Sequence, residues 1–190
     1  MSAPFVQGQY YHIYNRGCNK EQIFFNEENY RYLLRKIKET YEKAGVDMIA
    51  YCLMPNHYHL LVRQGGEIPL SSWLRYVFNG YTQAINIEQN RSGTLFQGRA
   101  KHILIDTEAY LMHVARYIHR NPVEAGLVSL PSEWLYSNYL EWVGEREGVL
   151  VNRELVKEYF PRPSDYRKFV EEYKRDVKMD EEAKPYLGEY

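Results

Sequence analysis

Two apolar runs separated by only two residues constrain the fold of this chain more than any other feature. VDMIAYCLM (46–54) and HYHLLVR (57–63) flank Pro55 and Asn56. Both runs are rich in aliphatic and aromatic side chains that suit a strand, and proline and asparagine are typical turn residues. Strands joined by so short a connection must run antiparallel. We therefore predict a β-hairpin over 46–63.

The remaining segments show helical and extended patterns on either side of this hairpin. In 26–45, Asn26 suits an N-cap, apolar side chains recur at helical spacing, and Gly45 suits a stop. The 107–121 helix should end before Pro122, since a residue preceding proline is disfavoured in helical conformation. Helices beside an antiparallel sheet define an α+β class. We predict further strands at 9–17 and 100–107, helices at 26–45, 69–90, 107–121 and 131–144, and two helical pieces within 151–177.

Length and composition narrow the class of protein. With 190 residues and 45% hydrophobic content, the chain suits one domain with a small appendage. Its two cysteines, Cys18 and Cys52, form neither a disulfide framework nor a CxxC zinc motif. We find no signal peptide and no apolar run that approaches the ~20 residues of a membrane span, so we expect a cytoplasmic protein with no membrane partner.

Charge is distributed unevenly along the chain. The formal net charge is −1, which taken alone argues against a nucleic-acid binder. Residues 1–130, however, carry 14 Lys and Arg against 11 Asp and Glu, whereas residues 131–190 carry 10 against 14. The net charge of the whole chain therefore hides a modestly basic segment, residues 1–130, behind an acidic C-terminal part. A phosphate-binding surface would depend on local clustering of basic residues.

Two histidines at alternate positions open the second strand of the hairpin. On a strand, His57 and His59 point to one face, and Tyr58 and Leu60 point to the other. Two imidazoles a few ångströms apart can share a metal ion, and the adjacent turn places them at the rim of the sheet. The same spacing also fits two half-buried histidines that bond to backbone or water.

A second polar group lies on the 107–121 helix. His113, Tyr117 and Asn121 follow one another at intervals of four residues, so they share a helix face. Tyr117 could offer a phenol, and Asn121 could offer an amide oxygen to a metal. Alternatively, Tyr117 packs as an amphipathic residue, and Asn121 only begins an Asn-Pro helix stop.

Four segments, HIYNRGCNKEQIF (12–24), YCLMPNHYHLLV, GTLFQGRAKHILID and RYIHRNPVEAGLV, occur in this order. Together they resemble the single-tyrosine HUH transposases, in particular the REP-associated tyrosine transposases and their insertion-sequence relatives. The resemblance covers roughly residues 8–142. It implies a catalytic domain over 1–145 and leaves 146–190 as a charged, helical appendage without family motifs.

The resemblance also implies a fold, a mechanism and a ligand set. The family fold is a ferredoxin-like antiparallel sheet with helices mainly on one face. Tyr117 matches the nucleophile that forms a 5′-phosphotyrosine with DNA. His57 and His59 match the HUH histidines, and Asn121 is similar to a third ligand, for Mg²⁺ or Mn²⁺. The expected partner is single-stranded or hairpin DNA, and we expect a monomer that uses its own tyrosine, with a homodimer as the alternative.

Several basic side chains could contact DNA phosphates, although any one of them taken singly is more often a solvated surface charge. Two rival functions also stay open. One is a metal-dependent nuclease that uses activated water, and the other is a domesticated, non-catalytic protein that binds DNA hairpins. The candidate DNA contacts are Arg16 and Lys20 in the first loop, Arg91, Arg99 and Lys101 around the Gly93–Gly98 loop, and Arg116 and Arg120 beside Tyr117.

Overall fold

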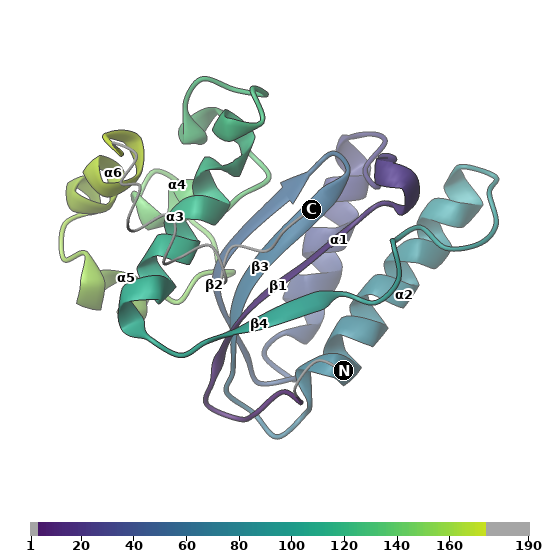
Figure 1. Ribbon diagram of the computed structural model, residues 1–190, viewed down its shortest axis with the longest axis horizontal. Helices are drawn as coiled ribbons and strands as arrows, with labels where there is room; N and C mark the ends of the chain where they lie inside the picture. Colours follow the sequence, from purple (N-terminus) through teal and green to yellow (C-terminus); the bar gives the residue numbers. More distant parts are fainter. Residues whose placement is uncertain (1–3, 174–190) are drawn as a thin grey trace.

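A four-stranded antiparallel sheet forms the centre of the molecule (Figure 1). The computed structural model describes residues 4–173. The predicted hairpin is confirmed: Met54 pairs with His57 directly across the Pro55–Asn56 turn. The strands are β1 (Tyr10–Arg16), β2 (Val46–Met54), β3 (His57–Gln64) and β4 (Lys101–Ile105), in the order β2-β3-β1-β4.

Helices of very different length surround the sheet. The predicted cap of the first is confirmed, because the Asn26 side chain accepts a hydrogen bond from the N–H of Asn29. The α-helices are α1 (Glu27–Thr40), α2 (Leu70–Glu88), α3 (Glu108–Glu124), α4 (Tyr139–Trp142), α5 (Arg153–Tyr159) and α6 (Pro163–Glu171), with 3-10 turns at Cys18–Lys20 and Pro131–Glu133.

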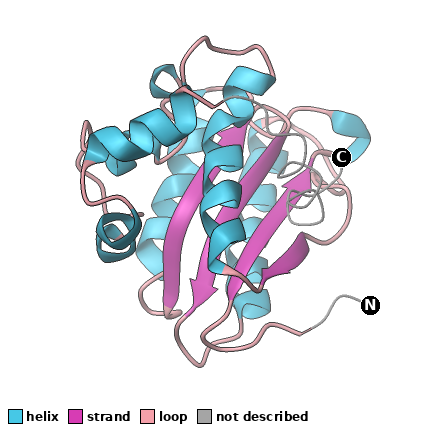
Figure 2. Cartoon of the chain, turned by 60° about the vertical axis from the view of Figure 1, so that its left-hand side comes forward, coloured by secondary structure: helices cyan, strands magenta, loops and turns pink. Residues whose placement is uncertain are grey.

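Helices cover both faces of the sheet, which corrects the expectation that they lie mainly on one. Figure 2 shows α3 in front of the strands and further helices behind them. One apolar cluster joins the sheet to α1 and α2, and a second joins it to α3 to α6. The cause lies in β2 and β3, whose side chains are buried almost throughout. Strands that are apolar on both faces need cover on both. The α+β class and the antiparallel sheet are confirmed.

Helix α3 continues through Pro122 to Glu124, so the predicted stop at this proline is wrong. Proline removes one backbone donor from a helix, but it leaves later bonds intact. The N–H of Ala125 still donates to the Asn121 carbonyl at 2.9 Å, and that of Leu127 to the Pro122 carbonyl. Asn121 and Pro122 are both buried, so tertiary packing outweighs the local preference.

The predicted helix over 131–144 is also largely wrong. Only Pro131–Glu133 and Tyr139–Trp142 are helical, and the chain between them runs along the outer edge of β2. There the N–H of Leu53 donates to the Tyr136 carbonyl. Pairing with the chain between the two helical turns covers an edge strand that would otherwise be exposed.

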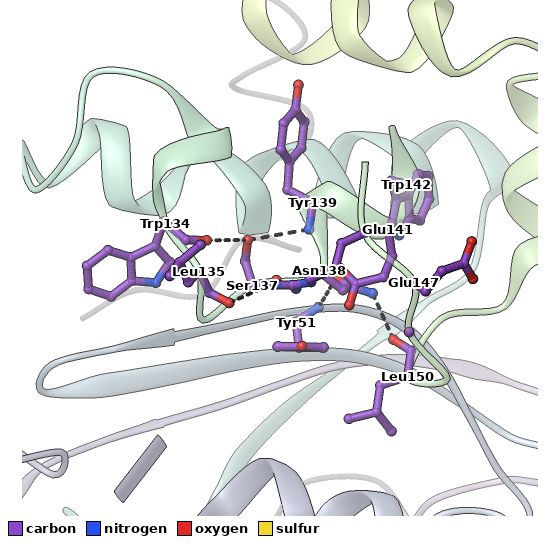
Figure 3. A network of polar contacts seen from close by, with 12 residues as sticks. Tyr51, Trp134, Leu135, Ser137, Asn138, Tyr139, Glu141, Trp142, Glu147 and Leu150 are labelled. Atoms are coloured by element: carbon purple, nitrogen blue, oxygen red, sulfur yellow. Dashed lines mark hydrogen bonds and ion pairs between the residues drawn. The ribbon is translucent and has the colours of Figure 1, made fainter. Parts of the chain in front are cut away.

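Asn138 fixes this segment to the sheet (Figure 3). Its amide nitrogen donates to the carbonyls of Ile49 and Leu150, and its oxygen accepts from the N–H of Tyr51. The same oxygen lies 2.8 Å from Nε2 of His119 on α3. One buried side chain therefore ties β2, α3 and the chain before α5 together.

The two predicted C-terminal helical pieces are present as α5 and α6, and both pack into the cluster around α3. The division of the chain at residue 145 stays a prediction, and residues 174–177 of the predicted 151–177 segment lie outside the described residues. Between residues 4 and 173, no helix combines the length and the apolar character that a membrane span requires. The cytoplasmic location stays a prediction.

Candidate functional site

His57 and His59 lie at the start of β3, on the face that α3 covers. Tyr58 and Leu60 belong to the opposite cluster, beside α1 and α2. The alternation expected of a strand therefore holds across this segment. The ring centroids of the two histidines are 5.2 Å apart, with the planes at 90°. His59 is fully buried, whereas His57 is partly exposed at the rim.

The side chain of Asn121 spans the two histidines. Its Oδ1 lies 3.0 Å from Nε2 of His57, and its Nδ2 lies 3.3 Å from Nε2 of His59. Asn121 itself is buried near the C-terminal end of α3. The structure thus brings the three predicted ligand side chains into direct contact, although they come from a strand and a helix that are far apart in sequence.

Tyr117 lies one helical turn before Asn121 and faces the same cluster. Its ring centroid is 5.4 Å from that of His59, with the planes at 86°. Burial raises the pKa of Tyr117 to about 12, while a hydrogen bond with Asn121 acts in the opposite direction. A nucleophilic phenolate here therefore needs a further positive charge nearby. The remaining member of the predicted helix face, His113, contacts Arg116 and Phe169 instead.

His12 on β1 is a residue of this site that the sequence did not predict. Its Nε2 lies 2.8 Å from Nδ1 of His59, and the two rings stack at 5.1 Å. The ring of Tyr14 is 5.1 Å from that of His12, on the same face of β1. The alternation within 9–17 puts His12 and Tyr14 on one face, but only the pairing of β1 with β3 brings that face to His59.

Both candidate ligand histidines favour the neutral form. Burial lowers the pKa of His57 and, more strongly, that of His59. For His57, a hydrogen bond with Asn121 acts in the opposite direction, and nearby Arg16 lowers the pKa further; His12 lowers the pKa of His59. A neutral imidazole offers one lone pair, which a metal ligand requires.

The donor set at this position fits a divalent cation. Imidazole nitrogen and amide oxygen are both ligands of first-row divalent metals, and oxygen also suits Mg²⁺. Adjacent ligands of an octahedral cation with bonds of 2.0–2.1 Å lie about 3.0 Å apart. The separation between Asn121 Oδ1 and His57 Nε2 is also 3.0 Å. Among residues 4–173, no group of three His, Cys, Asp or Glu side chains is placed to hold a metal ion.

Six of the seven candidate DNA-contacting side chains are at least partly exposed, and only Arg116 is buried. Arg16 ends β1 opposite His57, and Lys20 follows in the next turn. Lys101 begins β4 and lies 5.9 Å from the ring centroid of Tyr14. The exposed or partly exposed members of this set are Arg16, Lys20, Arg91, Arg99, Lys101 and Arg120.

Arg116 and Arg120 have partners within the fold. Arg116 is only 8% exposed, and its guanidinium carbon lies 3.8 Å from the ring centroid of Tyr173. Arg120 donates to the Val170 carbonyl and forms an ion pair with Glu124. These two arginines hold α3 against α6 and the residues that follow it.

Three comparisons with known proteins agree with this architecture. Residues 5–121 match the family model described as "Transposase IS200 like". A curated Haemophilus influenzae protein named "Putative REP-associated tyrosine transposase" is 26% identical over 112 residues, which are 54% of this chain and 64% of that protein. The alignment thus spans less than two thirds of the curated relative.

A solved REP-associated tyrosine transposase, bound to a REP hairpin, has the same fold. Its TM-score is 0.65 at 19% identity, over 80% of this chain and 93% of the other. The family match covers more than half of the sequence and includes the hairpin, the histidine pair, Tyr117 and Asn121. The chain therefore belongs to the IS200-like transposase family.

Proposed function

We propose that this chain is a metal-dependent DNA strand transferase whose nucleophile is Tyr117. The observation that carries the proposal is the grouping of a phenol with a two-histidine, one-amide donor set. The ring of Tyr117 lies 5.4 Å from that of His59 and shares a hydrogen bond with Asn121. A purely structural tyrosine has no need of two neutral histidines and an amide beside it.

His57 and His59, through Nε2, and Asn121, through Oδ1, would hold Mg²⁺ or Mn²⁺. When bound, such a cation favours the phenolate and polarises a phosphoryl oxygen. Three protein ligands would leave room for a phosphate oxygen and water at the same ion. The stacked ring of His12 keeps His59 in place behind the ligand position.

The proposed reaction conserves the phosphodiester bond energy. Tyr117 releases its proton to solvent, and Oη attacks the phosphorus of one DNA phosphodiester. The new O–P bond replaces the bond between phosphorus and the 3′ oxygen, which takes up a proton and leaves as a free 3′-OH. The DNA is then held as a 5′-phosphotyrosine. Attack by a later 3′-OH restores Tyr117 and joins the strands without ATP.

Single-stranded or hairpin DNA is the proposed substrate. The solved relative was bound to a REP hairpin, and we extend that preference to this chain. The DNA would approach the end of the sheet at which β1 ends and β4 begins, where the exposed cations are available for phosphates. We assign phosphate contacts to Arg16, Lys20, Arg91, Arg99 and Lys101. Arg116 and Arg120 are left out because their guanidinium groups contact α6, at Phe169 and Val170.

The proposed active site is complete within one chain. Helix α3 carries Tyr117 and packs on β2. Tyr166 and Val170, on α6 of the same chain, accept or share hydrogen bonds with α3 and hold it in place. We therefore favour a monomer that uses its own tyrosine, with a homodimer as the alternative.

A covalent-adduct assay tests this proposal. Hairpin oligonucleotides labelled at the 5′ or the 3′ end are incubated with the protein and Mn²⁺, and the products are separated on a denaturing protein gel. We expect label from the downstream, 5′-phosphate side to migrate with the protein. Tyr117→Phe should abolish the adduct and retain hairpin binding, whereas Tyr110→Phe, on the same helix, should retain both.

The other outcomes identify the rival functions. Cut DNA without an adduct, and unchanged cutting by Tyr117→Phe, would indicate a nuclease that uses water. Binding without cutting across many hairpins, unaffected by EDTA, would indicate a non-catalytic hairpin-binding protein.

A further inference from the structure

The tautomer of His57 can be deduced from the hydrogen bonds of its neighbour, Asn56. The amide nitrogen of Asn56 donates to the backbone carbonyl of Lys20 at 3.1 Å. A carbonyl can only accept, so this bond fixes which end of the Asn56 amide is nitrogen. The oxygen end lies 2.7 Å from Nδ1 of His57 and also can only accept. Nδ1 must therefore carry the hydrogen.

A hydrogen on Nδ1 determines the state of Nε2, at the opposite side of the His57 ring. A neutral imidazole has one N–H, so a hydrogen on Nδ1 leaves a lone pair on Nε2. That lone pair faces Oδ1 of Asn121 at 3.0 Å. In the Nδ1–H tautomer both of these atoms are acceptors, and a cation bound between them would satisfy both.

We propose that Asn56 is a positioning residue, which holds His57 as the Nδ1–H tautomer so that Nε2 is available as a metal ligand. The proposal rests on the proposed function for the role of this lone pair. At His59, by contrast, the partner of Nδ1 is His12, which can either donate or accept. Partners of this kind fix the tautomer and the orientation of ligand histidines in metal sites.

The carbonyl that orients Asn56 belongs to Lys20, in the turn Cys18–Lys20. Lys20 is also a candidate DNA contact. Asn19 and Lys20 have positive φ angles of 55° and 62°, which are uncommon for residues other than glycine. The N–H of Gly17 donates to the Asn56 carbonyl, and that of Ile23 to the Pro55 carbonyl. Several hydrogen bonds therefore hold the turn against the tip of the hairpin. Through Asn56, Lys20 connects the proposed DNA surface to His57.

Nitrogen-15 NMR of the histidine rings tests the tautomer directly, in metal-free protein and without DNA. Spectra are recorded at pH 8, where His57 is neutral, and His57→Gln assigns the signals. We expect hydrogen on Nδ1 in the wild type and in Asn56→Asp, whose carboxylate still accepts from Nδ1. In Asn56→Ala we expect a shift towards the Nε2–H form. Asn86→Ala, which removes an amide bonded to the Gly93 carbonyl, is the matched control and should change nothing.

Manganese titration followed by EPR gives the functional counterpart. Asn56→Ala should bind Mn²⁺ about 10- to 100-fold more weakly, and Asn56→Asp should bind it at least as well as the wild type. Hydrogen on Nε2 in the wild type or in Asn56→Asp, or an unchanged tautomer in Asn56→Ala, would overturn the proposal. Should Asn56→Ala not fold, the wild type and Asn56→Asp still decide it. A wild type that binds no Mn²⁺ but keeps Nδ1–H would contradict the proposed function and leave the tautomer deduction standing.

Discussion

At the scale of single residues, Asn121 connects the two halves of the candidate site. Its amide contacts both histidines, and it also bonds to the tyrosine one turn earlier. One side chain would therefore act on both the proposed cation and the phenol, so substitutions at Asn121 are informative about both.

Substitutions at Asn121 should separate metal binding from reactivity. Asn121→Leu removes the oxygen donor, so we expect Mn²⁺ affinity to fall by at least about tenfold. Asn121→Asp keeps the donor and adds a negative charge, so Mn²⁺ should bind at least as tightly. The same charge beside Tyr117 disfavours its phenolate, so adduct formation should slow. Mn²⁺ titration and single-turnover gel assays measure the two effects. Unchanged affinity in Asn121→Leu would remove the amide from the ligand set.

The sequence predicted the site through spacing within single elements. Alternation along β3 placed His57 and His59 on one face, and helical spacing placed Tyr117 and Asn121 on another; the family resemblance then joined the two. His12 was missed because its contact with His59 depends on which strand lies beside β3. That neighbour is set by sheet order, which a local pattern does not contain.

At the scale of elements, the errors arose where tertiary packing outweighed local preference. Pro122 did not end α3, because its surroundings are buried and the next backbone bonds remain. The 134–138 segment took an extended path, since its backbone pairs with the edge of β2. The long strands and helices, by contrast, followed their own periodicity, and their bounds agree with the prediction to within a few residues.

The turn after β1 should be sensitive to a single methyl group. A Cβ on Gly17 would lie 2.0 Å from the carbonyl oxygen of Glu21. This oxygen belongs to the backbone, so it cannot move aside as the end of a flexible side chain could. Gly17→Ala should therefore lower the free energy of unfolding by about 1–3 kcal/mol, the usual cost of overpacking. Hairpin DNA affinity should fall too, because Lys20 lies in this turn.

A helical glycine provides the matched control. In Gly80→Ala, on α2, the new Cβ meets only the flexible end of Lys36. Alanine is favoured over glycine in a helix, so we expect this variant to gain about 0.5–1 kcal/mol. Urea unfolding of both variants measures the difference. Equal effects of the two substitutions would contradict the close contact at Gly17.

At the scale of the whole molecule, stability depends on a histidine far from solvent. His119 is fully buried, with Nδ1 2.5 Å from the Tyr166 hydroxyl and Nε2 2.8 Å from Asn138 Oδ1. That oxygen accepts from Nε2–H, so Nδ1 accepts from the hydroxyl. This chain of hydrogen bonds connects α6 and α3 to the segment that covers β2.

Acid should weaken this connection within a defined pH range. Burial lowers the pKa of His119 from 6.5 to about 4, so below pH 6.5 the unfolded state binds a proton that the folded state resists. Stability is therefore retained above pH 6.5 and lost as the pH falls towards 4. Between pH 7 and pH 5 the free energy of unfolding should drop by about 2 kcal/mol more in the wild type than in His119→Gln. Urea unfolding at both values tests this, and parallel pH profiles would exclude His119 as the cause.

Helix α3 is hydrogen-bonded to α6 of the same chain, and this has a consequence for activity at low protein concentration. If the proposed nucleophile Tyr117 and the proposed cation ligands act within one folded chain, a lone copy suffices for a complete strand-transfer event. Turnover per molecule should then stay constant on dilution from micromolar to nanomolar protein, with saturating hairpin. A second-order fall in rate would mean that the tyrosine helix is shared between copies. Constant turnover would mean that a cell needs only a few molecules for the reaction.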